Sequence, residues 1–168
     1  MHHNSCTMTN RLLFPLVSSI VNGTTFGALV FAGVVDVRAL FALADAEGAE
    51  AMFKLLFPVW WPYGRDLMGP LTLFGCLLNL TAFHRTKDRL WAVSAATHAL
   101  ILGWTAVVMR RDIEVLVQAK MTSLAPTVRS FGRSHMPRIL FAGIGYVAST
   151  LALLFAADPA LSLDSIHM

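Results

Sequence analysis

The chain has 168 residues, of which 56% are hydrophobic and only 14% are charged, and its formal net charge is +3. So short a chain leaves too little polar sequence to enclose its long apolar segments in water, which excludes a soluble globular enzyme. The basic residues form no patch interleaved with aromatic side chains, so the positive charge does not indicate a nucleic-acid partner.

Four apolar runs without a charged side chain fill most of the sequence, at residues 12–35, 67–83, 90–109 and 139–157. A transmembrane helix needs about 20 mostly apolar residues to cross the hydrocarbon of a bilayer. Because lipid cannot hydrogen-bond to exposed backbone groups, each run is expected to be helical. We therefore predict an all-α, polytopic membrane protein with a single domain over residues 1–168, built as a bundle of four transmembrane helices.

The first run is too long for the hydrophobic region of a signal peptide, so we expect it to remain as a span. Within it, Gly23 and Gly27 are four residues apart, and the fourth run carries a stripe of small residues that includes Gly145 and Ser149. Small residues at helical spacing allow helix backbones to approach closely in lipid. These four positions are therefore the predicted helix-packing sites.

The first long connection contains an amphipathic segment at residues 45–57, with acidic residues in its first turn and apolar residues near its end. This pattern predicts a short helix that lies along the membrane interface. The two prolines of the following segment, residues 58–64, are expected to end that helix. Trp60, Trp61 and Tyr63 belong to this segment and are predicted to anchor it at the level of the lipid headgroups.

Beyond the third run, apolar residues continue at helical spacing over residues 112–125, so we expect the third helix to project past the lipid until Pro126 ends it. Four spans place both termini on one side of the membrane. The two long connections, residues 36–66 and 110–138, hold nine of the 13 lysine and arginine residues. The positive-inside rule then puts both termini on the outer side of a bacterial cytoplasmic or mitochondrial inner membrane.

His98 is the one histidine placed well inside a predicted span, and Asn79 and Tyr146 are polar residues of neighbouring spans. An ionisable residue at that depth usually faces the bundle interior and is a candidate for function. The alternative is a neutral histidine that hydrogen-bonds to Asn79, Tyr146 or Ser149 and only holds the bundle together. The sequence leaves both interpretations open.

Several chemistries are disfavoured by missing residues. A bis-histidine haem would need a second histidine at membrane depth, but His84 is at the edge of a span and His135 is outside the predicted spans. The two cysteines, Cys6 and Cys76, form no Cys-x-x-Cys pair. A P-loop, a glycine-rich dinucleotide fingerprint and a His-Glu-x-x-His motif are all missing from the sequence. We therefore expect neither a cofactor nor a metal ion, and the lack of a broken span disfavours a transporter.

The sequence nevertheless resembles a family in four segments, at residues 22–27 (Asn-Gly-Thr-Thr-Phe-Gly), 62–66 (Pro-Tyr-Gly-Arg-Asp), 109–116 (Met-Arg-Arg-Asp-Ile-Glu-Val-Leu) and 133–138 (Arg-Ser-His-Met-Pro-Arg). It is similar to the small four-helix membrane proteins that include the anthrone oxygenases of polyketide biosynthesis. The resemblance implies cofactor-independent oxidation of an electron-rich aromatic substrate. Where such relatives commonly have a Pro-x-Asn element after the third span, this chain has Arg111 and Asp112.

Two functional hypotheses follow. The first is a non-catalytic accessory subunit of a larger integral membrane complex, such as an energy-transducing one, with lipids and other membrane subunits as partners. The missing cofactor ligands and the departure from the family motif favour it. The second is an anthrone-oxygenase-like enzyme with a lipid-accessible pocket between the second, third and fourth spans. In that case His98 would act as the base, and Asn79 and Tyr146 would orient a phenolic substrate.

Overall fold

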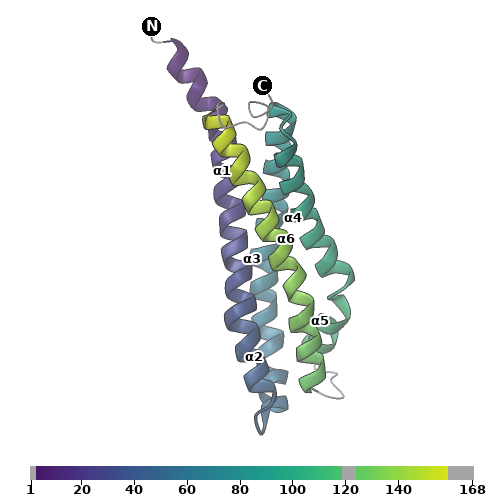
Figure 1. Cartoon of the computed structure of the whole chain (residues 1–168). Helices are drawn as coiled ribbons and strands as arrows, with labels where there is room; N and C mark the ends of the chain where they lie inside the picture. Colours follow the sequence, from purple (N-terminus) through teal and green to yellow (C-terminus); the bar gives the residue numbers. More distant parts are fainter. Residues whose placement is uncertain (1–2, 119–123, 159–168) are drawn as a thin grey trace.

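The computed structural model describes residues 3–118 and 124–158, with side chains from residue 13 onward, so the side chain of Cys6 lies outside it. Every regular element in the described residues is helical (Figure 1). The elements in chain order are α1 (His3–Phe31), the π-helical segment η1 (Ala32–Asp36), α2 (Val37–Ala44), α3 (Ala49–Thr86), α4 (Arg89–Val107), α5 (Arg110–Val117) and α6 (Leu124–Ala157).

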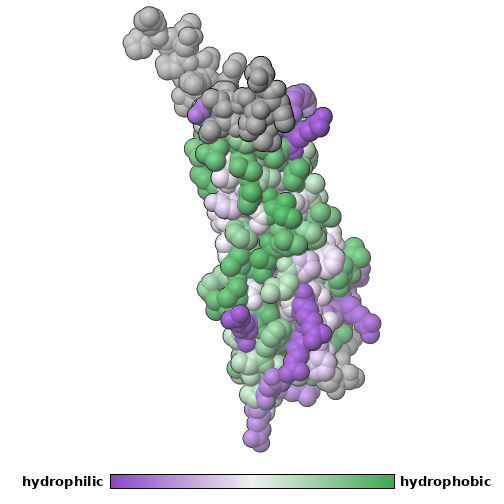
Figure 2. Space-filling view, viewed as in Figure 1, coloured by the Kyte–Doolittle hydropathy of each residue, from purple (hydrophilic) through white to green (hydrophobic). Residues whose placement is uncertain are grey.

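Four helical stretches are long and apolar enough to cross a membrane: Leu13–Ala44, Ala49–Thr86, Arg89–Val107 and Leu124–Ala157. The first of them joins α1, η1 and α2 into one continuous rod. This confirms the prediction of an all-α membrane protein with a four-helix bundle. Figure 2 agrees with it, because hydrophobic residues cover the middle of the visible face and strongly hydrophilic residues lie towards the two ends, more of them at the end where α2 meets α3.

The four rods run alternately up and down (Figure 1). The end of α6 and the connection between α3 and α4 lie at one end of the bundle, and the connection between α2 and α3 lies at the other end with α5. Both α1 and α4 pack against α3 and α6, so the four long helices enclose one common interior. The side of the membrane that each end faces stays a prediction.

The predicted interfacial helix at residues 45–57 is wrong as a separate element. The helix α3 starts at Ala49 and runs for 38 residues through Pro58, Pro62 and Pro70. At about 1.5 Å per residue it is roughly 57 Å long, well beyond the hydrocarbon thickness of about 30 Å. Tertiary packing explains why the prolines do not end the helix, since Phe53 and Phe57 are fully buried in a cluster shared with α5 and α6.

The predicted extension of the third helix to residue 125 is also wrong, although residues 119–123 of that segment lie outside the described part of the chain. The helix α4 ends at Val107, and α5 packs back onto α3 and α6 after a bend. Met109 and Leu116 are completely buried by this bend, which accounts for the change of direction. Pro126 is in the first turn of α6, where proline leaves no helical hydrogen bond unmade.

Candidate functional site

A closed network of side-chain hydrogen bonds joins the four long helices in the middle of the bundle. Asn22 of α1 and Asn79 of α3 exchange amide hydrogen bonds of 3.1 and 2.9 Å. Nδ2 of Asn22 also donates to Oγ of Ser94 on α4 at 2.9 Å, and this hydroxyl donates to the carbonyl oxygen of Gly145 on α6 at 2.9 Å. Asn22, Asn79 and Ser94 are all fully buried, and their polar groups are paired with one another through hydrogen bonds. The network therefore holds the four helices together.

His98 lies beside this network and is fully buried. Its Nδ1 is 2.9 Å from the carbonyl oxygen of Ser94, an acceptor, so we assign the proton of the neutral ring to Nδ1. Nε2 has no hydrogen-bond partner among the described residues and faces the backbone of Gly75. A Cβ atom added to Gly75 would lie 2.8 Å from Nε2, so the imidazole fills the space that this glycine leaves.

The three residues of the oxygenase hypothesis do not converge on one open space. His98 and Asn79 both lie against Gly75, where Nδ2 of Asn79 donates to its carbonyl oxygen at 2.7 Å. Tyr146 is instead on the outer surface, 37% exposed, where its ring stacks on Phe26 with 5.8 Å between centroids.

The other residues singled out by the sequence have differing surroundings. Tyr146 covers Gly23, whereas a Cβ atom on Gly27 would meet nothing within 4 Å. Gly145 lies directly against Thr97, and the backbone oxygen of Ser149 accepts a hydrogen bond of 3.1 Å from Ser19.

The three predicted anchor residues have different surroundings. Trp60 and Trp61 pack on the buried aromatic cluster around Phe57 and Phe131, whereas Tyr63 is 76% exposed.

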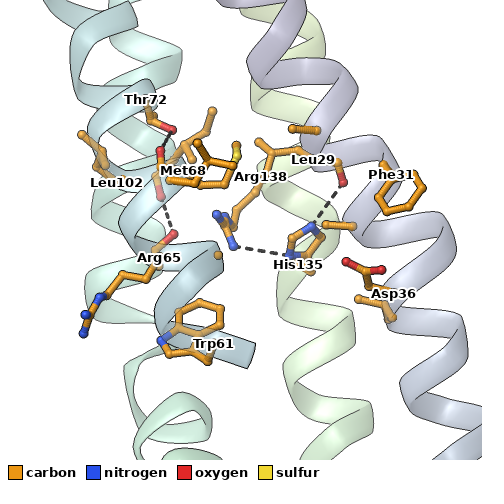
Figure 3. Close-up of a pocket in the computed structure, with 18 of the residues that line it drawn as sticks. Leu29, Phe31, Asp36, Trp61, Arg65, Met68, Thr72, Leu102, His135 and Arg138 are labelled. Atoms are coloured by element: carbon orange, nitrogen blue, oxygen red, sulfur yellow. Dashed lines mark hydrogen bonds between the residues drawn. The ribbon is translucent and has the colours of Figure 1, made fainter. Parts of the chain in front are cut away.

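A cavity of about 480 Å³ opens between α1, η1, α3, α4 and α6, and Figure 3 shows several of the residues that line it. Its walls are mainly apolar and aromatic, with Leu29, Phe31, Trp60, Trp61, Met68 and Ile101 among them. The polar side chains that line it are Asp36, Arg65, Thr72, Thr105, His135 and Arg138. Its volume falls within the range of about 300–1,000 Å³ that is typical of small-molecule sites.

Arg138 and His135 are the two buried polar side chains that α6 presents to this cavity, 6% and 5% exposed. Nη1 of Arg138 lies 3.3 Å from Nδ1 of His135, and Nε2 of His135 lies 3.3 Å from the carbonyl oxygen of Leu29 (Figure 3). The arginine can only donate, so we assign a neutral imidazole that accepts at Nδ1 and donates from Nε2. Nη1 also approaches the sulfur of Met109 at 3.8 Å.

The guanidinium of Arg138 has few hydrogen-bond partners. Its Nε is buried without a hydrogen bond, and no carboxylate of the described residues lies within 4 Å of it. The other cation of the cavity differs, because Nε of Arg65 is 2.7 Å from Oδ1 of Asp66 and both side chains are exposed. Asp36 is half-buried on the wall formed by η1.

His135, which the sequence places outside the predicted spans, belongs to the same helix as the fourth apolar run. The helix α6 begins at Leu124 rather than near residue 139, so His135 and Arg138 are helical, and their spacing of three residues puts them on one face. Arg133, His135 and Arg138 stand directly before an apolar run, and this is the signal in the sequence that points to the site.

The segment η1 brings the first helix close to that face. A Cβ atom added to Gly33 would clash with the side chain of Ile139 and approach Cδ2 of His135 to 3.2 Å. A larger residue here would have to displace the end of the Ile139 side chain and would press on His135. π-Helical turns are frequent at functional sites.

A comparison of the chain with protein-family models, with curated proteins and with solved structures finds no match.

Proposed function

We propose that this protein binds a lipophilic small molecule inside the membrane, in the cavity between α1, η1, α3, α4 and α6. The observation that carries this proposal is the cavity itself, about 480 Å³ with mainly apolar and aromatic walls. It lies between helices that are long and apolar enough to span a bilayer, so a hydrophobic ligand would reach it from the lipid.

The geometry gives less support to a catalytic role for His98. A base must come within hydrogen-bond reach of the proton that it removes. Nε2 of His98 faces Gly75, and neither His98, Asn79 nor Tyr146 lines the cavity. The oxygenase hypothesis would therefore need a rearrangement of the packed interior.

The accessory-subunit hypothesis stays a prediction. Large apolar side chains on the outer faces, such as Leu67, Leu77 and Leu140, would suit either lipid or a neighbouring subunit. A ligand-binding role is compatible with membership of a larger complex, because the cavity is formed by this chain alone.

Photolabelling tests the proposal with the full-length chain in nanodiscs of phosphatidylcholine. The probe is hexadecanol that carries a diazirine in its chain, and the labelled peptides are quantified by mass spectrometry. We compare Gly64→Phe with Gly103→Phe, because a Cβ atom at either glycine meets nothing within 4 Å but only Gly64 lines the cavity.

We expect labelling of cavity-lining peptides in the unmodified chain, a loss of several-fold in Gly64→Phe and no loss in Gly103→Phe. Labelled positions are assigned to single residues, and Trp91, which is fully buried away from the cavity, serves as an internal reference. Labelling restricted to lipid-facing residues, or equal in both variants, would refute a ligand site in this cavity.

A further inference from the structure

We propose that the ligand of this cavity carries an anionic head group, a carboxylate or a phosphate, that pairs with Arg138 while its apolar part lies against the aromatic wall. This inference rests on the binding function proposed above and specifies the chemical class of the ligand.

The guanidinium of Arg138 is buried beside the cavity without a counter-ion in the described part of the chain. Arg138 is 94% buried, lines the cavity and points into it between Met68 and His135 (Figure 3). Among the described residues its Nε proton has no acceptor, and Nη1 contacts His135 and the sulfur of Met109. A buried cation without a counter-ion is unfavourable, and within membrane helices such a residue usually marks a functional pathway or site.

His135 holds the guanidinium of Arg138 in position at the cavity wall. Nε2 of His135 donates to the carbonyl oxygen of Leu29, and Nδ1 accepts from Nη1 of Arg138. These two contacts hold one N–H group of the guanidinium in place, while Nε is buried without a partner among the residues that the structure describes. Arginine presents its N–H groups in a geometry that matches the paired oxygens of a carboxylate or phosphate. The cavity therefore offers an anion a preorganised partner at one end and an apolar surface beyond it.

The other charged groups of the cavity distinguish an anionic ligand from a zwitterionic one. Arg65 already has Asp66 as its partner and is exposed. Asp36 places a carboxylate on the η1 wall, more than 4 Å from any basic nitrogen of the described residues. For an anionic ligand Asp36 is a nearby repulsive charge, whereas a zwitterionic ligand would use it to hold an amine. The two cases predict opposite effects of removing this carboxylate.

The experiment compares three probes of equal chain length: hexadecanoic acid, hexadecyl phosphate and hexadecanol. Each is used to displace the hexadecanol photolabel from the full-length chain in phosphatidylcholine nanodiscs. We expect at least one anionic probe to bind about tenfold more tightly than hexadecanol, which is the size of effect expected for one charge-assisted hydrogen bond. The tighter anion then identifies a carboxylate or a phosphate as the preferred group.

Two variants test the roles of the charges. Arg138→Met keeps an unbranched, flexible side chain and removes the charge, so the anion preference should disappear while hexadecanol still binds. Asp36→Asn leaves Arg138 intact and should leave anion binding unchanged or strengthen it. Asp36→Asn also keeps the proposal testable if Arg138→Met does not fold, as judged by circular dichroism and gel filtration.

Each contrary result has a distinct meaning. Equal affinity for all three probes, or an anion preference that persists in Arg138→Met, would overturn the anionic ligand but leave the cavity as a binding site. A loss of anion binding in Asp36→Asn would overturn it in favour of a zwitterion. No displacement of label from the cavity by any probe would refute the binding function itself.

Discussion

Nη1 of Arg138 lies 3.3 Å from Nδ1 of His135, three residues earlier on α6. This contact makes the histidine a neutral acceptor and the arginine a donor that is held at the cavity wall. His135 is in this way a positioning residue, whose effect on a ligand would be transmitted through Arg138.

The first prediction concerns this positioning. His135→Phe removes both the acceptor for Arg138 and the donor to Leu29, so it should weaken binding of the preferred anionic probe several-fold and leave hexadecanol binding unchanged. His135→Gln can still accept from the guanidinium through its side-chain oxygen and should restore part of the anion affinity. Displacement of the photolabel measures both. Equal losses of anion and alcohol binding in His135→Phe would show that the histidine supports only the fold.

The second prediction tests whether residues 49–57 belong to a packed transmembrane rod. Phe53 is fully buried, and Leu55, two residues later, is 77% exposed. Phe53→Ala should lower the free energy of unfolding by about 3–5 kcal/mol through the cavity that it creates. Leu55→Ala should cost less than about 1 kcal/mol. Similar values for the two variants in a denaturant titration in detergent would instead fit a separate helix lying on the membrane surface.

The third prediction concerns the polar network. Asn22→Ala and Asn79→Ala should each lower the free energy of unfolding by about 1–2 kcal/mol, because each leaves buried polar partners unsatisfied. The double variant should lose less than the sum, since both residues belong to one network. Thr24→Ala is the control, because its exposed hydroxyl only donates to Ile20 of its own helix. Additive losses would mean that the two amides act independently.

The fourth prediction addresses the packing of His98 on Gly75. An added Cβ atom at position 75 would lie 2.8 Å from both Cδ2 and Nε2 of the ring. Gly75→Ala should therefore destabilise the protein by about 1–3 kcal/mol, and this cost should fall in a His98→Ala background, where the ring is missing. Thermal unfolding of the four proteins measures the coupling.

The same variants examine the oxygenase hypothesis. Oxygen uptake with an anthrone-type substrate that depends on His98 and survives Gly75→Ala would contradict a purely packing role for the imidazole.

Much of the architecture followed from the sequence alone. Uncharged apolar runs of bilayer length predict spanning helices because lipid leaves the backbone no other way to satisfy its hydrogen bonds. For the same reason, Asn79 and His98 were recognisable as residues of the bundle interior, since polar groups avoid lipid. These inferences use only local composition and the thickness of the membrane.

The tertiary structure decided what depends on contacts between distant residues. Pro58 and Pro62 predict a helix end locally, but the burial of Phe53 and Phe57 against α6 keeps α3 continuous. His98 could have faced a pocket or a packed interior, and Gly75 and Gly145 determine that the ring is enclosed. The cavity around Arg138 exists only because η1, α3, α4 and α6 approach one another there. A local pattern in one segment of the chain does not predict contacts between these distant segments.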